Sequence, residues 1–122
     1  MTEKENFIFN FKNRTKKLAT DVIKMLDNLK KQKSSNTITY QLIRFVTSIA
    51  ANYRAACRAR SKKEFHSKIC IVVEEADETL FWLELLTDLN LLDNNDALNQ
   101  LIDETEQILK VVAKAKNTNY DK

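Results

Sequence analysis

The residues best suited to chemistry in this sequence are a run of cations. Seven basic side chains lie between positions 44 and 68, against a single acid, Glu64. Such a cluster can contact the phosphates of a nucleic acid. No helix-turn-helix, RNP or zinc-finger signature accompanies it, so recognition of base sequence is not indicated. The residues expected to bind nucleic acid are Arg44, Arg54, Arg58, Arg60, Lys62 and Lys63, together with Lys16 and Lys17 from the preceding part of the chain.

A catalytic centre is not indicated. Nucleophile–histidine–acid triads and most metal centres need histidine or clustered carboxylates, and His66 is the only histidine. An exposed position at the start of a helix is the simpler interpretation of His66. The acidic run at 74–78 could hold a divalent metal, but salt bridges on a helix surface are the simpler interpretation there. We therefore expect a protein that is not an enzyme and has no catalytic residue, metal site or cofactor.

Charge is distributed unevenly along the chain, although the net charge is only +3. Residues 1–36 carry nine basic and four acidic side chains, and residues 37–70 carry seven and one. Residues 71–109 carry eleven acids and no base. Two interpretations stay open. Either the two halves neutralise each other as neighbouring helices or subunits, or the basic half leaves a patch free for a polyanion.

These side chains must be positioned by helices, because the chain of 122 residues contains no glycine and no proline. Tight β-hairpins and glycine-rich phosphate loops depend on glycine. Apolar residues recur instead at helical spacing, and residues 61–64 (SKKE) form a capping box at a helix start. We predict an all-α, antiparallel up-down-up-down four-helix bundle in one domain, 1–122, with helices at about 5–31, 37–59, 62–90 and 94–115.

Polar residues mark the expected helix ends. Ser35 or Asn36 is expected to cap the second helix, and Asp93 or Asn94 the fourth. Residues 117–122 are expected to fray. On antiparallel neighbouring helices, Cys57 and Cys70 would lie too far apart for a disulfide. We expect both to be reduced and buried.

No segment of the chain is expected to enter a membrane. No apolar stretch approaches the roughly 18 residues that a spanning helix needs. The first residues mix charges with apolar side chains and lack the apolar core of a signal peptide. We expect a cytoplasmic protein.

The third predicted helix is apolar on two faces. One stripe begins at Phe65, and a second lies roughly 150° away around the helix. A four-helix bundle buries one face of each helix, so the second face is expected to form a subunit interface. The residues expected there are Trp82, Leu85, Leu86 and Leu89, with Glu75 and Glu78 beside them.

Three segments of the chain resemble a known family, the bacterial four-helix-bundle proteins encoded in intervening sequences of 23S rRNA genes. The segments are 47–52 (TSIAAN), 61–65 (SKKEF) and 75–86 (EADETLFWLELL). An aromatic pair near the start, Phe7 and Phe9, is also similar to the beginning of that family. The likeness covers about residues 5–115 and is most specific over 41–92.

The resemblance implies a bundle that assembles into a ring-shaped homo-oligomer, typically a pentamer. Relatives include the accessory protein of diversity-generating retroelements, a basic pentameric barrel that binds nucleic acid and a reverse transcriptase. Val46 and Ala50 stand where the family often has glycine, and Ala55 stands where it often has glutamate. Without that glutamate, Arg54 and Arg58 are freer to contact phosphate.

Two functions are therefore expected. The first is a non-enzymatic oligomer that binds structured RNA or DNA through basic surfaces of the first two helices. The alternative is a scaffold that presents acidic or apolar ring surfaces to a protein partner, such as a reverse transcriptase.

Overall fold

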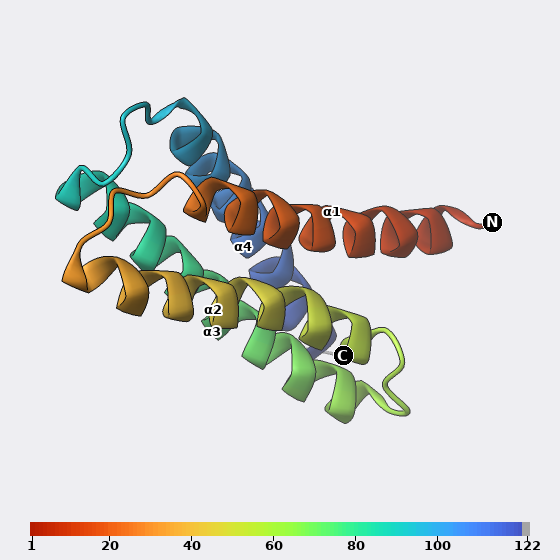
Figure 1. Ribbon diagram of the computed structural model, residues 1–122. Helices are drawn as coiled ribbons and strands as arrows, with labels where there is room; N and C mark the ends of the chain where they lie inside the picture. Colours follow the sequence, from red (N-terminus) through yellow and green to blue (C-terminus); the bar gives the residue numbers. More distant parts are fainter. Residues whose placement is uncertain (121–122) are drawn as a thin grey trace.

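The computed structural model describes residues 1–120 and contains four helices in that part of the chain (Figure 1). They are α1 (Glu3–Leu26), α2 (Lys33–Ala56), α3 (Lys62–Leu89) and α4 (Asp96–Tyr120). No strand occurs among the described residues, so the all-α prediction is confirmed. Helix α4 continues through 117–120, where fraying was predicted. Asp121 and Lys122, the rest of that predicted tail, lie outside the described residues.

The end of α1 and the start of α2 differ from the prediction, because the Ser35 side chain caps α2 from within its first turn. Helix α2 starts at Lys33, so Ser35 lies in its first turn rather than before it. The Ser35 hydroxyl oxygen accepts a hydrogen bond from the Gln32 backbone N–H at 3.2 Å and donates to the Lys30 carbonyl at 2.6 Å. Helix α1 ends at Leu26, earlier than predicted, and leaves room for a longer connection.

Short polar residues lie at the start of α3, at the start of α4 and at the end of α3. Ser61 caps α3 as predicted, because its hydroxyl oxygen accepts from the Glu64 N–H at 3.0 Å. The other half of the predicted capping box differs, because the Glu64 carboxylate accepts from the Arg60 N–H at 2.8 Å instead of from the Ser61 N–H. Of the two residues predicted to cap α4, Asn94 accepts a hydrogen bond from the Asp96 N–H at 2.7 Å. Asn90 ends α3 with φ of 53°, a left-handed conformation usually adopted by glycine, which this chain lacks.

The helices enclose one apolar core. Helix α1 contacts α2 and α4, and α3 contacts the same two helices from the other side. The buried side chains form a single cluster that includes Leu42, Ile49, Leu83 and Ile108. Figure 1 shows the N-terminal part of α1 extending past the other helices, and Phe11 is the first buried residue along it.

The cysteines and the histidine are half-buried, which differs from the prediction for each of them. Cys57 and Cys70 are free thiols, as predicted, but neither is fully buried. His66 is half-buried rather than exposed. Its Nε2 lies 3.5 Å from the Sγ of Cys70, one turn further along α3. Among the described residues, no helix is both long enough and apolar enough to cross a membrane.

Candidate nucleic-acid interface

The outer surface of α2 is basic because this helix contains no acidic residue. Its buried stripe, which includes Leu42, Ile49 and Tyr53, points to the core. On one side of that stripe Phe45 faces α3, where it lines a hollow together with glutamates of α3. Arg54 is exposed and lies about 120° from the middle of the stripe in the other direction. Arg54 therefore occupies the outer flank of α2 that borders α1.

The flank of α1 that borders α2 is basic as well. Arg14 marks the opposite flank, because its guanidinium bonds to Glu104 of α4. Lys12 and Lys16 each lie two residues from Arg14 and hence about 160° around the helix from it. The rings of Phe11 and Tyr53 meet with centroids 4.8 Å apart, which places this part of α1 level with the end of α2.

On this placement Lys12 and Lys16 of α1 and Arg54 of α2 lie along the border between the two helices, and Arg58 follows in the turn just past the end of α2. We call Lys12, Lys16, Arg54 and Arg58 the basic seam. None of the four forms an ion pair with a carboxylate in the part of the chain that the structure describes. Lys12 is half-buried and the other three side chains are exposed. Cations without a carboxylate partner among the described residues are available to neutralise phosphates.

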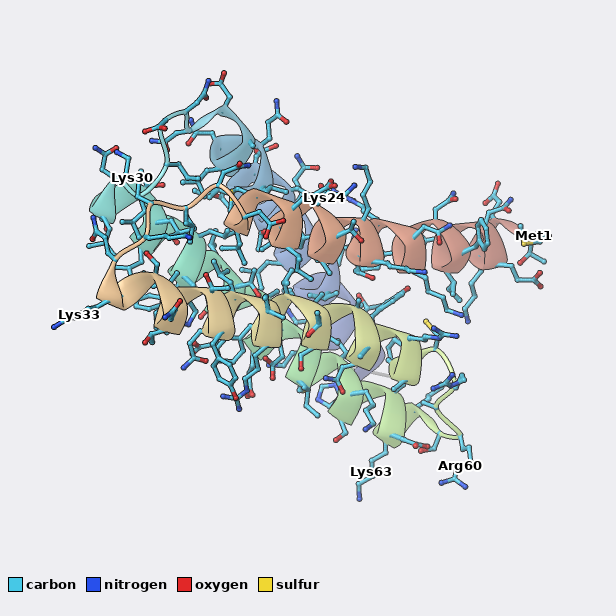
Figure 2. The ribbon with its side chains drawn as sticks, viewed as in Figure 1. Met1, Lys24, Lys30, Lys33, Arg60 and Lys63 are labelled. Carbon is cyan, nitrogen blue, oxygen red and sulfur yellow. The ribbon has the colours of Figure 1, made fainter. Side chains whose placement is uncertain are left out.

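The turn between α2 and α3 extends this basic surface around the end of the bundle. Figure 2 shows Arg60 and Lys63 there, with both side chains directed away from the helices. Arg60 is 92% exposed, and its Nε lies 3.8 Å from a Glu64 oxygen. A surface pair of that length is weak. Lys62 is exposed beside them, so the turn and the first residues of α3 together contribute three exposed cations.

Two of the residues predicted to bind nucleic acid lie apart from the seam. The Arg44 guanidinium carbon is 5.2 Å from the centre of the Phe45 ring, on the side of α2 that faces α3. Burial raises the pKa of Glu75, and the charge of Arg44 opposes this rise only in part. Lys17 donates to Asp21 at 2.7 Å and lies about 100° around α1 from Lys16. The structure therefore separates Arg44 and Lys17 from the other predicted residues.

Neutralisation between the two halves of the chain occurs between α1 and α4 and between the α1–α2 and α3–α4 connections. The Arg14 Nε and Nη2 donate to the two Glu104 carboxylate oxygens, each at 2.7 Å, and Nη2 also donates to Gln107 at 3.0 Å. Hydrogen bonding to Glu104 raises the pKa of the guanidinium. Lys30 pairs with Asp93 at 3.5 Å. The acidic half thus neutralises these two cations, and within residues 1–120 it leaves the basic seam without a carboxylate partner.

The predicted interface on α3 needs one correction, because Leu86 is fully buried in the core. The buried stripe of α3 passes through Val72, Thr79 and Leu86, at intervals of seven residues. Because Thr79 is polar, a search for apolar residues at helical spacing does not identify this stripe. Its hydroxyl donates to the Glu75 carbonyl at 2.8 Å, which allows a polar side chain to lie in the core.

The outer face of α3 does carry an apolar patch. Leu89 is 44% exposed, and Trp82 and Leu85 are half-buried. Phe81, which the periodicity missed, is 55% exposed and meets Trp82 edge-on, with ring centroids 5.3 Å apart. We call these four residues the α3 patch.

The acidic run of α3 lines a hollow between α3 and Phe45 of α2. Glu74, Glu75, Asp77 and Glu78 surround it together with Phe45, and its volume is about 330 Å³. Among the described residues, no group of three or more histidine, cysteine or acidic side chains is placed to hold a metal ion. Glu75 and Glu78, which were predicted to lie near a subunit interface, both belong to this hollow.

Two comparisons with known proteins found a match, one to a protein family and one to a solved structure. A family model described as 23S rRNA-intervening sequence protein matches residues 9–114. Among solved structures, the chain is similar to a protein of unknown function from the S23 ribosomal protein family of Bacteroides thetaiotaomicron. That match has a TM-score of 0.77 and 27% sequence identity, and it covers 86% of this chain and 96% of the other. No curated protein matches the sequence.

Proposed function

The chain belongs to the 23S rRNA-intervening sequence protein family, and from this premise we propose that it is a non-enzymatic protein that binds RNA or another nucleic acid through its basic seam. We further propose that its helices form an up-down-up-down bundle and that several copies assemble into a ring. The observation that supports binding is the absence of any carboxylate partner for Lys12, Lys16, Arg54 and Arg58 among the described residues. Neither comparison indicates an enzyme family.

Binding at the basic seam would be electrostatic and directed to the sugar-phosphate backbone. Each phosphate that a lysine or arginine neutralises releases counterions, so the affinity falls as salt rises. The bound form would be selected by its shape and backbone, since helix surfaces of this kind offer no reading of base edges. The arginine and lysine side chains of the α2–α3 turn would add contacts at the end of the bundle.

Charge reversal at the seam tests this proposal. In Arg54→Glu/Arg58→Glu, two phosphate contacts are lost, so the slope of log Kd against log salt should fall by about 1.4 for a single strand. Affinity for a labelled RNA should drop at least about tenfold in fluorescence anisotropy at about 100 mM salt.

The matched control is Lys31→Glu/Lys33→Glu, which changes the net charge equally at the opposite end of α2. Figure 2 shows Lys33 at that end, far from Arg60 and Lys63. Its affinity should stay within about twofold of the unmodified protein at the same salt. Equal losses from both double variants would show that only total charge matters and would contradict a site at the seam.

The α3 patch supports the proposed assembly. Phe81, Leu85 and Leu89 are spaced by four residues, so they form one line along the outside of α3. A contiguous exposed apolar surface of this kind marks a site of protein contact. Light scattering should give a mass that is a multiple of 14.2 kDa. A monomer at concentrations of about 10 μM, where stable oligomers persist, would contradict the assembly.

A second candidate function is a scaffold for a protein partner, and the same patch is the observation that favours it. Acidic side chains, including Glu78 and Glu84, lie along the exposed side of α3 near the patch. In this case the purified chain should recover one protein both before and after nuclease treatment. Leu89→Asp should abolish that recovery, whereas Arg54→Glu/Arg58→Glu should leave it intact.

A further inference from the structure

Two phenylalanines of α1 are exposed where the helix extends past the bundle. Phe7 and Phe9 are each 54% exposed, whereas Phe11 is buried. Phe7 and Phe9 are two residues apart, so they point about 160° away from each other around the helix. An exposed aromatic ring loses the stabilisation that burial would provide. The two side chains therefore need separate explanations.

Phe7 is explained by the core. It stacks on Phe11, with centroids 5.6 Å apart and an angle of 7° between the ring planes. Phe11 in turn meets Tyr53 of α2. Phe7 thus continues the buried stripe of α1 by one further turn.

Phe9 is not explained in this way, because it lies on the face of α1 that carries the basic seam. Lys12 and Lys16 follow it at intervals of three and seven residues, which places all three side chains on one side of the helix. Among residues 1–120, no ring contact or cation–π contact involves Phe9. An open aromatic ring therefore stands in line with two lysines, on the flank of α1 that borders Arg54 and Arg58.

An aromatic ring in line with cations matches the chemistry of unpaired nucleotides. In single-stranded nucleic acid the phosphates contact lysine and arginine, and the exposed bases stack on aromatic rings. In a duplex the bases are already stacked inside the helix and cannot reach such a ring. A second copy of this seam is disfavoured as the occupant, because like charges would face each other.

We propose that Phe9 is a stacking platform for an unpaired base, so that the basic seam takes single-stranded or looped RNA in preference to a continuous duplex. This inference rests on the proposed function, since it names the class of nucleic acid that the seam would hold. It adds Phe9 to the binding residues and gives the site a selectivity that cations alone do not provide.

The test compares Phe9→Ala with Phe7→Ala, which alter opposite faces of α1. Phe9→Ala and Phe7→Ala remove rings of equal exposure from the same helical segment. Anisotropy titrations would use an unstructured single-stranded RNA of about 20 nucleotides, longer than one stacking site, and a duplex of the same length. Phe9→Ala should weaken single-strand binding about tenfold and leave duplex binding within about twofold. Phe7→Ala should change neither, and Phe9→Trp should retain the single-strand affinity.

Each other outcome overturns the inference. An equal loss for both RNAs, or no loss, would mean that Phe9 does not stack on a base. A change in the mass measured by light scattering for Phe9→Ala would make Phe9 a subunit contact instead. If Arg54→Glu/Arg58→Glu abolishes binding while Phe9→Ala has no effect, only the stacking inference fails. If the unmodified protein binds neither RNA at low salt, the proposed function fails with it. Far-UV circular dichroism verifies that each variant keeps its helices.

Discussion

Arg14 should stabilise the fold without contributing to nucleic-acid binding. It makes two hydrogen bonds of 2.7 Å to Glu104, and both side chains are 31% exposed. Exposed ion pairs contribute about 0.2–1 kcal/mol, and bidentate arginine–carboxylate pairs are the stronger ones. Partial exposure still screens this pair. We therefore expect a coupling free energy of about 1 kcal/mol between Arg14 and Glu104.

A double-mutant cycle measures this coupling. The free energy of unfolding would be determined in urea for the unmodified protein, Arg14→Ala, Glu104→Ala and the double variant, all at one protein concentration because assembly shifts apparent stability. Arg54→Ala is the control, since this exposed arginine has no carboxylate partner among the described residues. Its cost should stay within about 0.5 kcal/mol. At about 1 M salt the Arg14 coupling should shrink, because the screening length falls to roughly 3 Å.

The same variants separate folding from binding. Arg14→Ala should keep its RNA affinity within about twofold, because Glu104 already neutralises this charge, whereas Arg54→Ala should lose affinity. A coupling below about 0.2 kcal/mol would refute the view that this pair ties α1 to α4. A larger loss of RNA affinity from Arg14→Ala than from Arg54→Ala would refute the assignment of these arginines to separate roles.

Two further predictions concern α3. Burial raises the pKa of Glu75 in the folded state, so its ionised form opposes folding, and that penalty grows as pH rises above the ordinary value of 4.5. Glu75→Gln should therefore raise the Tm measured in a thermal melt at pH about 7 and lose this gain near pH 4. Leu86→Ala should cost about 2–5 kcal/mol of unfolding free energy, because the side chain is fully buried. Leu89→Ala should cost within about 0.5 kcal/mol but lower the mass measured by light scattering, and the reverse pattern would restore Leu86 to the interface.

Most of the fold could be predicted from the sequence, because each helix is determined by residues that lie close together in the chain. A chain without glycine or proline, with apolar residues at helical spacing, has few alternatives to helices. The ends of α1 and α2 could not be predicted, because Ser35 caps from inside the helix through the Lys30 carbonyl. The predicted core stripe of α3 included Ile69, Ala76 and Leu83, which are buried, but it omitted Thr79, a polar residue that a count of apolar positions passes over.

In the candidate site, too, local spacing could be predicted, whereas contacts between distant parts of the chain could not. The spacing of four residues predicts that Arg54 and Arg58 share a helix face, but α2 ends at Ala56 and Arg58 lies in the turn beyond it. The separation of Arg14 from Lys12 and Lys16 depends on Glu104, ninety positions further along the chain. Phe9 could have been included from its spacing to Lys12 and Lys16. Its exposure, however, becomes evident only once α1 is seen to extend past the bundle.

The salt dependence of binding to single-stranded RNA tests the central claim most directly. The four cations of the basic seam predict a slope of about −3 for log affinity against log salt, at about −0.7 for each neutralised phosphate, and contacts from the α2–α3 turn would make it steeper. The unmodified protein should show this slope in anisotropy titrations between about 50 and 300 mM salt. A slope near zero, or no binding at the lowest salt, would contradict a nucleic-acid interface at the seam.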